Sequence, residues 1–303
     1  MTAARIDRGT LFTIWGAGGS APTGDPRRSR FGGDTICFEV RRLDEAAPPL
    51  VIDLGSASLN LGADLARRAA AAGRPIAAEI LLSHLHLDHV IGLPFFGPFY
   101  TPGAQLRLHC GVVDSAWDLQ DKLSRFAAPP FFPVHPLQME TVRYARFDPT
   151  RPFELCGMRI TPGLSHHPGG CCAFRIEGPD GAIAIIGDHE HGDPEADARM
   201  AELARGADLL LYDGAYDDDD FARRRGWGHS TWQHGADFAR EAGAGRALIY
   251  HHQPEHSDDE LDAIEARLRR RLPVAAMARQ NMRILIGPEG ARVLDPAETV
   301  RED

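Results

Sequence analysis

The chain has 303 residues, of which 43% are hydrophobic and 25% charged, as in ordinary soluble globular proteins. It contains no run of about 18 apolar residues, so we expect no membrane span, and its amino-terminal stretch lacks the apolar core of a secretory signal. The formal net charge of −10 disfavours binding of long polyanions such as DNA, although bound metal ions would still allow a small phosphate ester to bind. Five cysteines without a CxxC pair argue against a disulfide framework and favour a reducing cytoplasm.

Short β-branched or leucine-rich runs recur along the chain and predict buried strands. These runs are 11–15, 35–40, 50–53, 79–83, 105–110, 159–164, 173–177, 182–187, 209–212, 246–251 and 283–287. Helical patterns lie between them in both halves, and no linker or low-complexity segment divides the chain. We therefore expect one α/β domain over residues 1–303, with sheets inside and helices outside.

Capping residues predict where several helices begin and end. Ser58 is expected to cap a helix that stops at Gly73, and either Ser230 or Thr231 one that ends near Gly243. Asp193-Pro194 predicts an N-cap with a first-turn proline and a stop at Gly206, and 257–260 (SDDE) predicts a capping box.

Three segments do not fit strands or helices. The proline- and aromatic-rich segments 94–103 and 127–136 are expected to be ordered loops, which either form walls at the mouth of an active site or fill the core with their phenylalanines. The run Asp217–Asp220 predicts a solvated turn rather than a metal site.

The segment His84-Leu85-His86-Leu87-Asp88-His89 carries the most information about function. Imidazole nitrogen and carboxylate oxygen suit Zn²⁺, Mn²⁺ and Fe. If 79–83 is a strand, His84 and His86 project to the same side, because side chains alternate along extended backbone. Asp88 and His89 then fall in the following turn and can face a second point. The spacing indicates two ligands for each of two neighbouring metals rather than a solvated polar loop.

Further candidate ligands follow other predicted strands. One of His166 and His167 should bind metal, since a strand ends there in a glycine-rich turn. Asp188 follows a buried strand, and its two oxygens could bridge two cations. His251 ends another strand, whereas His189 and His191 are expected to be exposed loop residues.

These residues resemble the metallo-β-lactamase fold superfamily, and within it the phosphodiesterase branch that includes ribonuclease Z and class II-like cyclic-nucleotide phosphodiesterases. The resemblance spans nearly the whole chain and implies a four-layer αββα sandwich. The matching elements are the HxHxDH signature at 84–89, Asp53 after an apolar strand, the glycine-rich turn 16–22, His167 in HPGG, Asp188 in IGDHE and His251 before 252–254 (HQP).

The resemblance also implies a dinuclear site. One metal would be held by His84, His86 and His167, the other by Asp88, His89 and His251, with Asp188 bridging them. Zn is the expected ion, with Mn or Fe as alternatives. A water shared by two such cations would be acidified to hydroxide near neutral pH. Asp53 would orient a ligand histidine, or only shape the turn.

Asp213 and His229 match a carboxylate–imidazole pair of the ribonuclease Z branch. The resemblance implies that His229 protonates the leaving oxygen, while Asp88 could also guide the nucleophile. The alternatives are that Asp213 is a turn residue and that His229 neighbours a helix cap.

The function expected from the sequence is metal-dependent hydrolysis of a small or cyclic nucleotide, or of a similar phosphodiester. A ribonuclease Z-like endonuclease is the alternative enzyme, but the chain lacks a long Gly-Pro-rich insertion of the kind that grips tRNA. A non-catalytic metal- or ligand-binding sensor is the alternative outside enzymes. Dimer formation rests on family analogy alone. The roles of Cys171 and Cys172 stay open.

Overall fold

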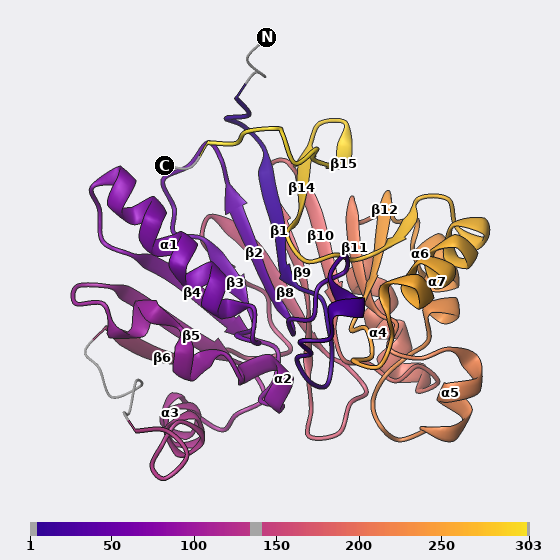
Figure 1. Cartoon of the computed structure of the whole chain (residues 1–303), viewed down its shortest axis with the longest axis horizontal. Coiled ribbons are helices and arrows are strands. Elements are labelled where there is room, and N and C mark those ends of the chain that lie inside the picture. The colour runs from indigo at the N-terminus through magenta and orange to yellow at the C-terminus, as the bar shows by residue number, and fades with distance from the viewer. Residues whose placement is uncertain (1–4, 134–140, 302–303) are drawn as a thin grey trace.

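The computed structural model describes residues 5–133 and 141–301, and it consists of two β-sheets packed face to face with helices outside them (Figure 1). Three layers of buried apolar side chains hold this arrangement together. One lies between the sheets, and one lies between each sheet and the helices on its outer face. The four-layer αββα sandwich expected from the sequence is therefore confirmed. Within the described residues, no helix is long and apolar enough to cross a lipid bilayer.

The first sheet has eight strands, and its central strands come from the amino-terminal half. Their order is β15 (Gly290–Val293), β14 (Met282–Gly287), β1 (Thr10–Gly16), β2 (Cys37–Arg42), β3 (Leu50–Ile52), β4 (Ala77–Leu82), β5 (Gln105–Cys110) and β6 (Val142–Arg146). Strands β3 to β6 are parallel, so their carboxyl ends lie along one edge.

The second sheet has seven strands. Their order is β13 (Ala275–Met277), β12 (Arg246–Tyr250), β11 (Leu209–Asp213), β10 (Gly181–Ile186), β9 (Cys172–Gly178), β8 (Met158–Leu164) and β7 (Phe153–Leu155). Strands β10 to β13 are parallel, whereas β7, β8, β9 and β10 pair antiparallel.

The described residues form seven α-helices, which are α1 (Ser58–Ala72), α2 (Leu87–Val90), α3 (Ala116–Phe126), α4 (Pro194–Ala204), α5 (Asp218–Arg223), α6 (Trp232–Ala242) and α7 (Asp258–Arg271). Buried side chains of α1 and α3 pack on the first sheet, and those of α4, α6 and α7 pack on the second. Short 3₁₀ turns lie at Pro26–Arg28, Leu93–Phe95 and Gly97–Tyr100.

Every strand predicted from an apolar run is present, with ends shifted by at most two residues. Strands β6, β7, β13 and β15 and helix α3 were not predicted, and Asp88 and His89 lie in the short helix α2 rather than in the expected turn. β13 is short and mostly alanine, and β15 is an exposed terminal strand of its sheet, so neither carries a clear apolar pattern. Helix α3 buries mainly Leu119 and Leu123 and is otherwise polar.

Most predicted caps are confirmed: the side chains of Asp193, Thr231 and Ser257 each accept a backbone N–H in the first helical turn. The predicted role of Ser58 is wrong, because Ala57 occupies the N-cap position without a side-chain bond. The predicted turn at Asp217–Asp220 is also wrong, since Asp217 caps α5.

The first aromatic segment, 94–103, contributes to the core, whereas the described part of the second has no buried phenylalanine. Phe96 and Phe99 are fully buried against the first sheet, in contact with each other, while Phe95 and Phe131 are 57% and 88% exposed. The part of the second predicted loop from 134 to 136 lies outside the described residues.

Replacing Phe38 by alanine is expected to lower the free energy of unfolding by about 3–5 kcal/mol. Phe38 is fully buried between the sheets, with its ring centroid 5.5 Å from that of Phe12 and 5.3 Å from that of Tyr250. Urea unfolding measures the loss, with the exposed Val274→Ala as control. A loss below about 1 kcal/mol would contradict this packing.

Candidate metal centre

The candidate metal ligands, and the residues that hydrogen-bond to them, mostly lie at or just beyond the carboxyl ends of strands in both sheets. Open sheets with parallel strands place their binding residues at this edge. The residues concerned are Asp53 after β3, Ser83 and His84 after β4, His167 after β8, Asp188 after β10, Asp213 at the end of β11 and His251 after β12. Segments far apart in sequence therefore meet at one point of the sandwich.

A first group of potential ligand atoms comes from His84, His86, His167 and Asp188, all within 4.8 Å of one another. The Nε2 atoms of His84 and His167 lie 3.6 and 3.7 Å from Asp188 Oδ2. The Nε2 atom of His167 is 2.9 Å from Nδ1 of His86. His86 is exposed while the other three are buried, so this group opens to solvent on the His86 side.

A second group comes from Asp88, His89 and His251, all buried. Nε2 of His251 lies 3.3 Å from Asp88 Oδ2, and Nε2 of His89 lies 3.7 Å from the same oxygen. The other oxygen of Asp188, Oδ1, lies 3.3 Å from His89 Nε2 and 3.5 Å from His251 Nε2. The two oxygens of Asp188 thus face different groups, which is the arrangement a bridging carboxylate needs.

The donor set fits divalent cations. Nε2 of His84, His89 and His251 and Oδ1 of Asp188 are buried and have no hydrogen-bond partner in the described part of the chain. Such buried polar atoms are costly unless another group satisfies them. Two ligands at about 2.0–2.1 Å from a tetrahedral zinc are roughly 3.3–3.4 Å apart. The spacings around Asp188, from 3.3 to 3.7 Å, are close to this value.

Charges in the centre also suit a cation. Burial lowers the pKa of His84 well below its usual value and lowers that of His167, so both imidazoles keep a lone pair free at neutral pH. Burial opposes ionisation of Asp188, but the neighbouring His89 and His251 hold its pKa well below the ordinary value. The first group therefore combines neutral imidazoles with an ionised carboxylate. In the second group, burial opposes a charge on His89 and His251, but the carboxylate of Asp188 outweighs it and raises the pKa of both well above the usual value, so metal binding there would release protons.

Asp53 holds His89 in place. Its Oδ2 lies 2.7 Å from Nδ1 of His89, and its two oxygens also accept the backbone N–H and the hydroxyl of Ser83 at 2.7 and 2.8 Å. The carboxylate fixes Nδ1 of His89 as the protonated nitrogen, which leaves Nε2 for a metal. Asp53 has a φ of 60°, a left-handed conformation that is uncommon outside glycine and typical of functional sites.

The glycine-rich turn after β1 supports the second group. The backbone N–H of Ser20 donates to Asp88 Oδ2 at 2.7 Å. A Cβ added to Gly19 would lie 2.0 Å from Nδ1 of His251, so only glycine leaves room for that imidazole. His251 itself has a φ of 63°. The tight turn thus seats two candidate ligands at once.

Glu190 is a supporting residue that sequence reasoning missed. Its buried carboxylate accepts the backbone N–H groups of Gly226 and Gly228 at 2.7 and 2.9 Å, and Gly228 in turn accepts Nδ1–H of His167 at 2.8 Å. Glu190 therefore holds the loop that orients a candidate ligand. The only sequence signal was its place two residues after Asp188.

His229 and Asp213 form the expected pair. Nδ1 of His229 lies 2.9 Å from Oδ2 of the fully buried Asp213. His229 also lies within 4.8 Å of Asp188 and His251, by their potential ligand atoms. Because Nδ1 is bonded to Asp213, His229 has only Nε2 left to offer to a bound molecule or a metal.

Other histidines have structural roles. His166 stays outside both groups and bonds through Nδ1 to the carbonyl of Glu190 at 3.1 Å. The expectation of exposed loop positions for His189 and His191 is wrong, because His189 is buried with Nε2 2.9 Å from Asp197, and the His191 ring stacks on that of His234. His189 also accepts the backbone N–H of His166, and the half-buried His191 lies 3.1 Å from the hydroxyl of Ser230, so both have polar partners that their own segment does not reveal.

Comparison with known proteins places this geometry in a family. Residues 56–252 match the model of the beta-lactamase superfamily domain. That match covers more than half of the chain, and the chain belongs to this superfamily. It includes every candidate ligand, while the supporting Gly19, Ser20 and Asp53 lie before it.

Relatives and solved structures agree with this assignment. A ribonuclease Z of Salinibacter ruber is 33% identical over 160 residues, which cover 49% of this chain and 48% of that protein. An uncharacterized protein of Mycobacterium tuberculosis is 29% identical over 191 residues, 56% of this chain and 58% of that protein. The chain thus spans about half the length of these curated relatives.

Two solved structures share the fold. The metallo-beta-lactamase fold protein YhfI of Bacillus subtilis superposes with a TM-score of 0.64 at 20% identity, covering 90% of this chain and 98% of YhfI. The short form of human tRNase Z gives a TM-score of 0.61 at 19% identity, covering 91% and 99%.

Gly19→Ala is expected to lower the divalent-metal content of the purified protein, because the new methyl group would displace the imidazole of His251. Elemental analysis after dialysis measures the content. Gly24→Ala is the matched control, since a Cβ there has no atom within 4 Å. Equal metal content in both variants and the parent protein would contradict a role for His251 in binding.

Proposed function

We propose that the chain is a single-domain, dinuclear metal-dependent phosphodiesterase acting on a small or cyclic nucleotide or a similar diester. The observation that carries this proposal is the division of two ligand groups around the two oxygens of Asp188, with the His229–Asp213 pair beside them. The superfamily match and the relatives named ribonuclease Z support hydrolysis, and a solved diphosphatase of the PhnP family has the same fold at a TM-score of 0.59 and 18% identity.

In this proposal His84, His86 and His167 hold one cation, Asp88, His89 and His251 hold the other, and Asp188 is shared. Zinc is the expected ion, because imidazole and carboxylate ligands suit it, and Mn or Fe would suit the same donors. When bound, a pair of divalent cations neutralises phosphate charge and makes water more acidic.

The chain's own residues then position the reactants and move a proton. Asp213 accepts Nδ1–H of His229 and orients the ring, so that Nε2 can donate a proton to the leaving oxygen. Asp88, whose carboxylate accepts the N–H of Ser20, would orient the attacking water. Asp53 and Gly228 keep His89 and His167 from turning away.

Two features favour a small diester over a tRNA precursor. The net charge of −10 repels an extended polyanion. The sequence also has no long Gly-Pro-rich insertion of the kind with which ribonuclease Z grips tRNA. Because one relative is named ribonuclease Z, RNA cleavage is the second candidate function.

We also propose a cytoplasmic location, because all five cysteines are unpaired.

Metal analysis combined with a diester screen tests the function. Two zinc equivalents per chain and hydrolysis of bis(4-nitrophenyl) phosphate that chelation abolishes and zinc restores are the expected results. Bound metal with no turnover of any diester would instead indicate a binding protein, and faster cleavage of a tRNA precursor than of cyclic nucleotides would indicate a nuclease.

His229→Ala is expected to slow diesters with poor alkoxide leaving groups by about 10²–10⁴-fold and nitrophenyl esters far less, because nitrophenolate leaves without a proton. Steady-state kinetics on matched alkyl and nitrophenyl diesters measure the two losses, with His256→Ala as control. Equal losses on both substrates would reject the role of His229 as proton donor.

A further inference from the structure

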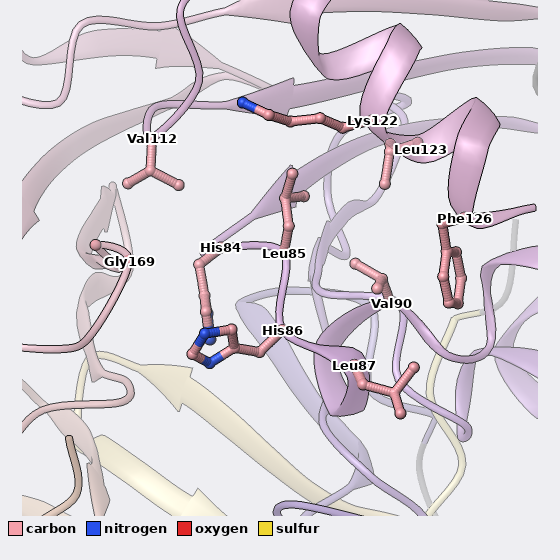
Figure 2. Close-up of a pocket in the computed structure, with 11 residues that line it drawn as sticks. His84, Leu85, His86, Leu87, Val90, Val112, Lys122, Leu123, Phe126 and Gly169 are labelled. Carbon is pink, nitrogen blue, oxygen red and sulfur yellow. The ribbon is translucent and has the colours of Figure 1, made fainter. Parts of the chain in front are cut away.

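A cavity of about 450 Å³ lies next to the candidate metal centre, between helix α3 and the segment that carries His84 and His86 (Figure 2). Its volume is in the range of sites for small organic ligands. Both imidazoles line it, so it is continuous with the first ligand group. Any molecule whose phosphate reached His86 would have this space beside it.

Most of the lining is apolar. The side chains that form it, from α2, α3 and the loops beside them, are Leu85, Leu87, Val90, Val112, Leu123 and Phe126. Leu87 is 55% exposed at this position, although it is a large apolar residue. An apolar or aromatic group placed here would remove this surface from water, at about 25 cal/mol for each Å² buried.

One cationic side chain, Lys122, also lines the cavity, and it is the only lysine in the sequence. Its Nζ lies 2.5 Å from Asp118 Oδ2, and the side chain is 47% exposed. An ammonium has three N–H donors, so this ion pair leaves capacity for another acceptor. In Figure 2 Lys122 extends from α3 toward Val112, at a distance from the imidazoles of His84 and His86.

We propose that this cavity binds the organic group of the substrate and that Lys122 binds a negatively charged substituent at the far end of that group. The inference rests on the proposed phosphodiesterase function and specifies its substrate class. This class is a small diester whose organic group is apolar or aromatic near the phosphate and anionic farther away. Phe126 and Lys122 then determine specificity, one through contact area and the other through charge.

The alternative is that Lys122 only stabilises α3 through its pair with Asp118, four residues earlier. Helix α3 contains its own matched control for this, because Arg125 pairs with Asp121 at the same spacing. Arg125 is 78% exposed and does not line the cavity. Replacing either residue by methionine removes one positive charge and one ion pair from the same helix.

Binding of three phosphonates to the zinc-loaded protein, measured by calorimetry, tests the proposal without relying on turnover. The probes are methylphosphonate, phenylphosphonate and 4-carboxyphenylphosphonate. We expect phenylphosphonate to bind about tenfold more tightly than methylphosphonate, and the carboxylate to add a further severalfold gain. Phe126→Ala should reduce the phenyl-over-methyl ratio at least threefold, whereas the exposed Val274→Ala should leave it as in the parent protein.

The gain from the carboxylate should disappear in Lys122→Met and persist in Lys122→Arg and Arg125→Met. If Phe126→Ala does not fold, Leu87→Ala tests the same wall at an exposed position. Ratios that are the same in every variant would overturn the proposal, as would an equal loss in Lys122→Met and Arg125→Met.

Failure of the proposed function would look different. The parent protein would then hydrolyse no diester, whatever the phosphonate ratios. If only the cavity inference is wrong, the parent protein hydrolyses diesters and the binding ratios do not respond to Phe126→Ala or Lys122→Met.

Discussion

The structure is organised around one buried carboxylate. Asp188 is 1% exposed, and its two oxygens lie between imidazoles from opposite sheets. An ionised carboxylate at such a depth is very costly unless positive charge compensates it. The nearby His84 and His167 are kept neutral by burial, so they supply lone pairs and no charge. Burial also opposes a charge on His89 and His251, but the carboxylate of Asp188 raises the pKa of both well above the usual value, so these two rings supply the compensating charge, and the proposed divalent cations would supply it in their place.

The two-sheet sandwich makes this arrangement possible. Parallel strands in each sheet bring several carboxyl ends to one edge, and the buried layer between the sheets fixes the distance between those edges. Local backbone strain is also present there: Asp53 and His251 both adopt positive φ. Such conformations persist only where the surrounding structure fixes them. Here the bond from Asp53 to His89 and the close approach of Gly19 to His251 do so.

The sequence predicted most of the strands and the candidate ligands because both have local signatures, while the division of the ligands into two groups was implied by the family resemblance. An apolar run followed directly by histidine or aspartate marks a strand end, and His84 to His89 lie in one continuous segment. The residues that hold these ligands in place have no such signature in the sequence. Glu190 acts through backbone N–H groups of a loop 36 and 38 residues away, and His189 is buried because Asp197 and the backbone of His166 bind it. Interactions of that kind depend on tertiary contacts rather than on residue spacing.

Helix α3 was also not predicted from the sequence, and its position beside the metal centre bears on substrate specificity. Its pattern is too polar to stand out in the sequence, yet the fold places Lys122, Leu123 and Phe126 beside the HxHxDH segment. The ligand groups determine which bond a hydrolase of this kind can attack, and they are built from strand ends that the fold requires. The adjoining helix lies outside the sheets and packs on the first sheet mainly through Leu119 and Leu123, so its other side chains can change without disturbing that sheet. Substrate choice in this chain is therefore expected to depend on α3, where a single lysine stands on an otherwise mainly apolar wall of a strongly acidic protein.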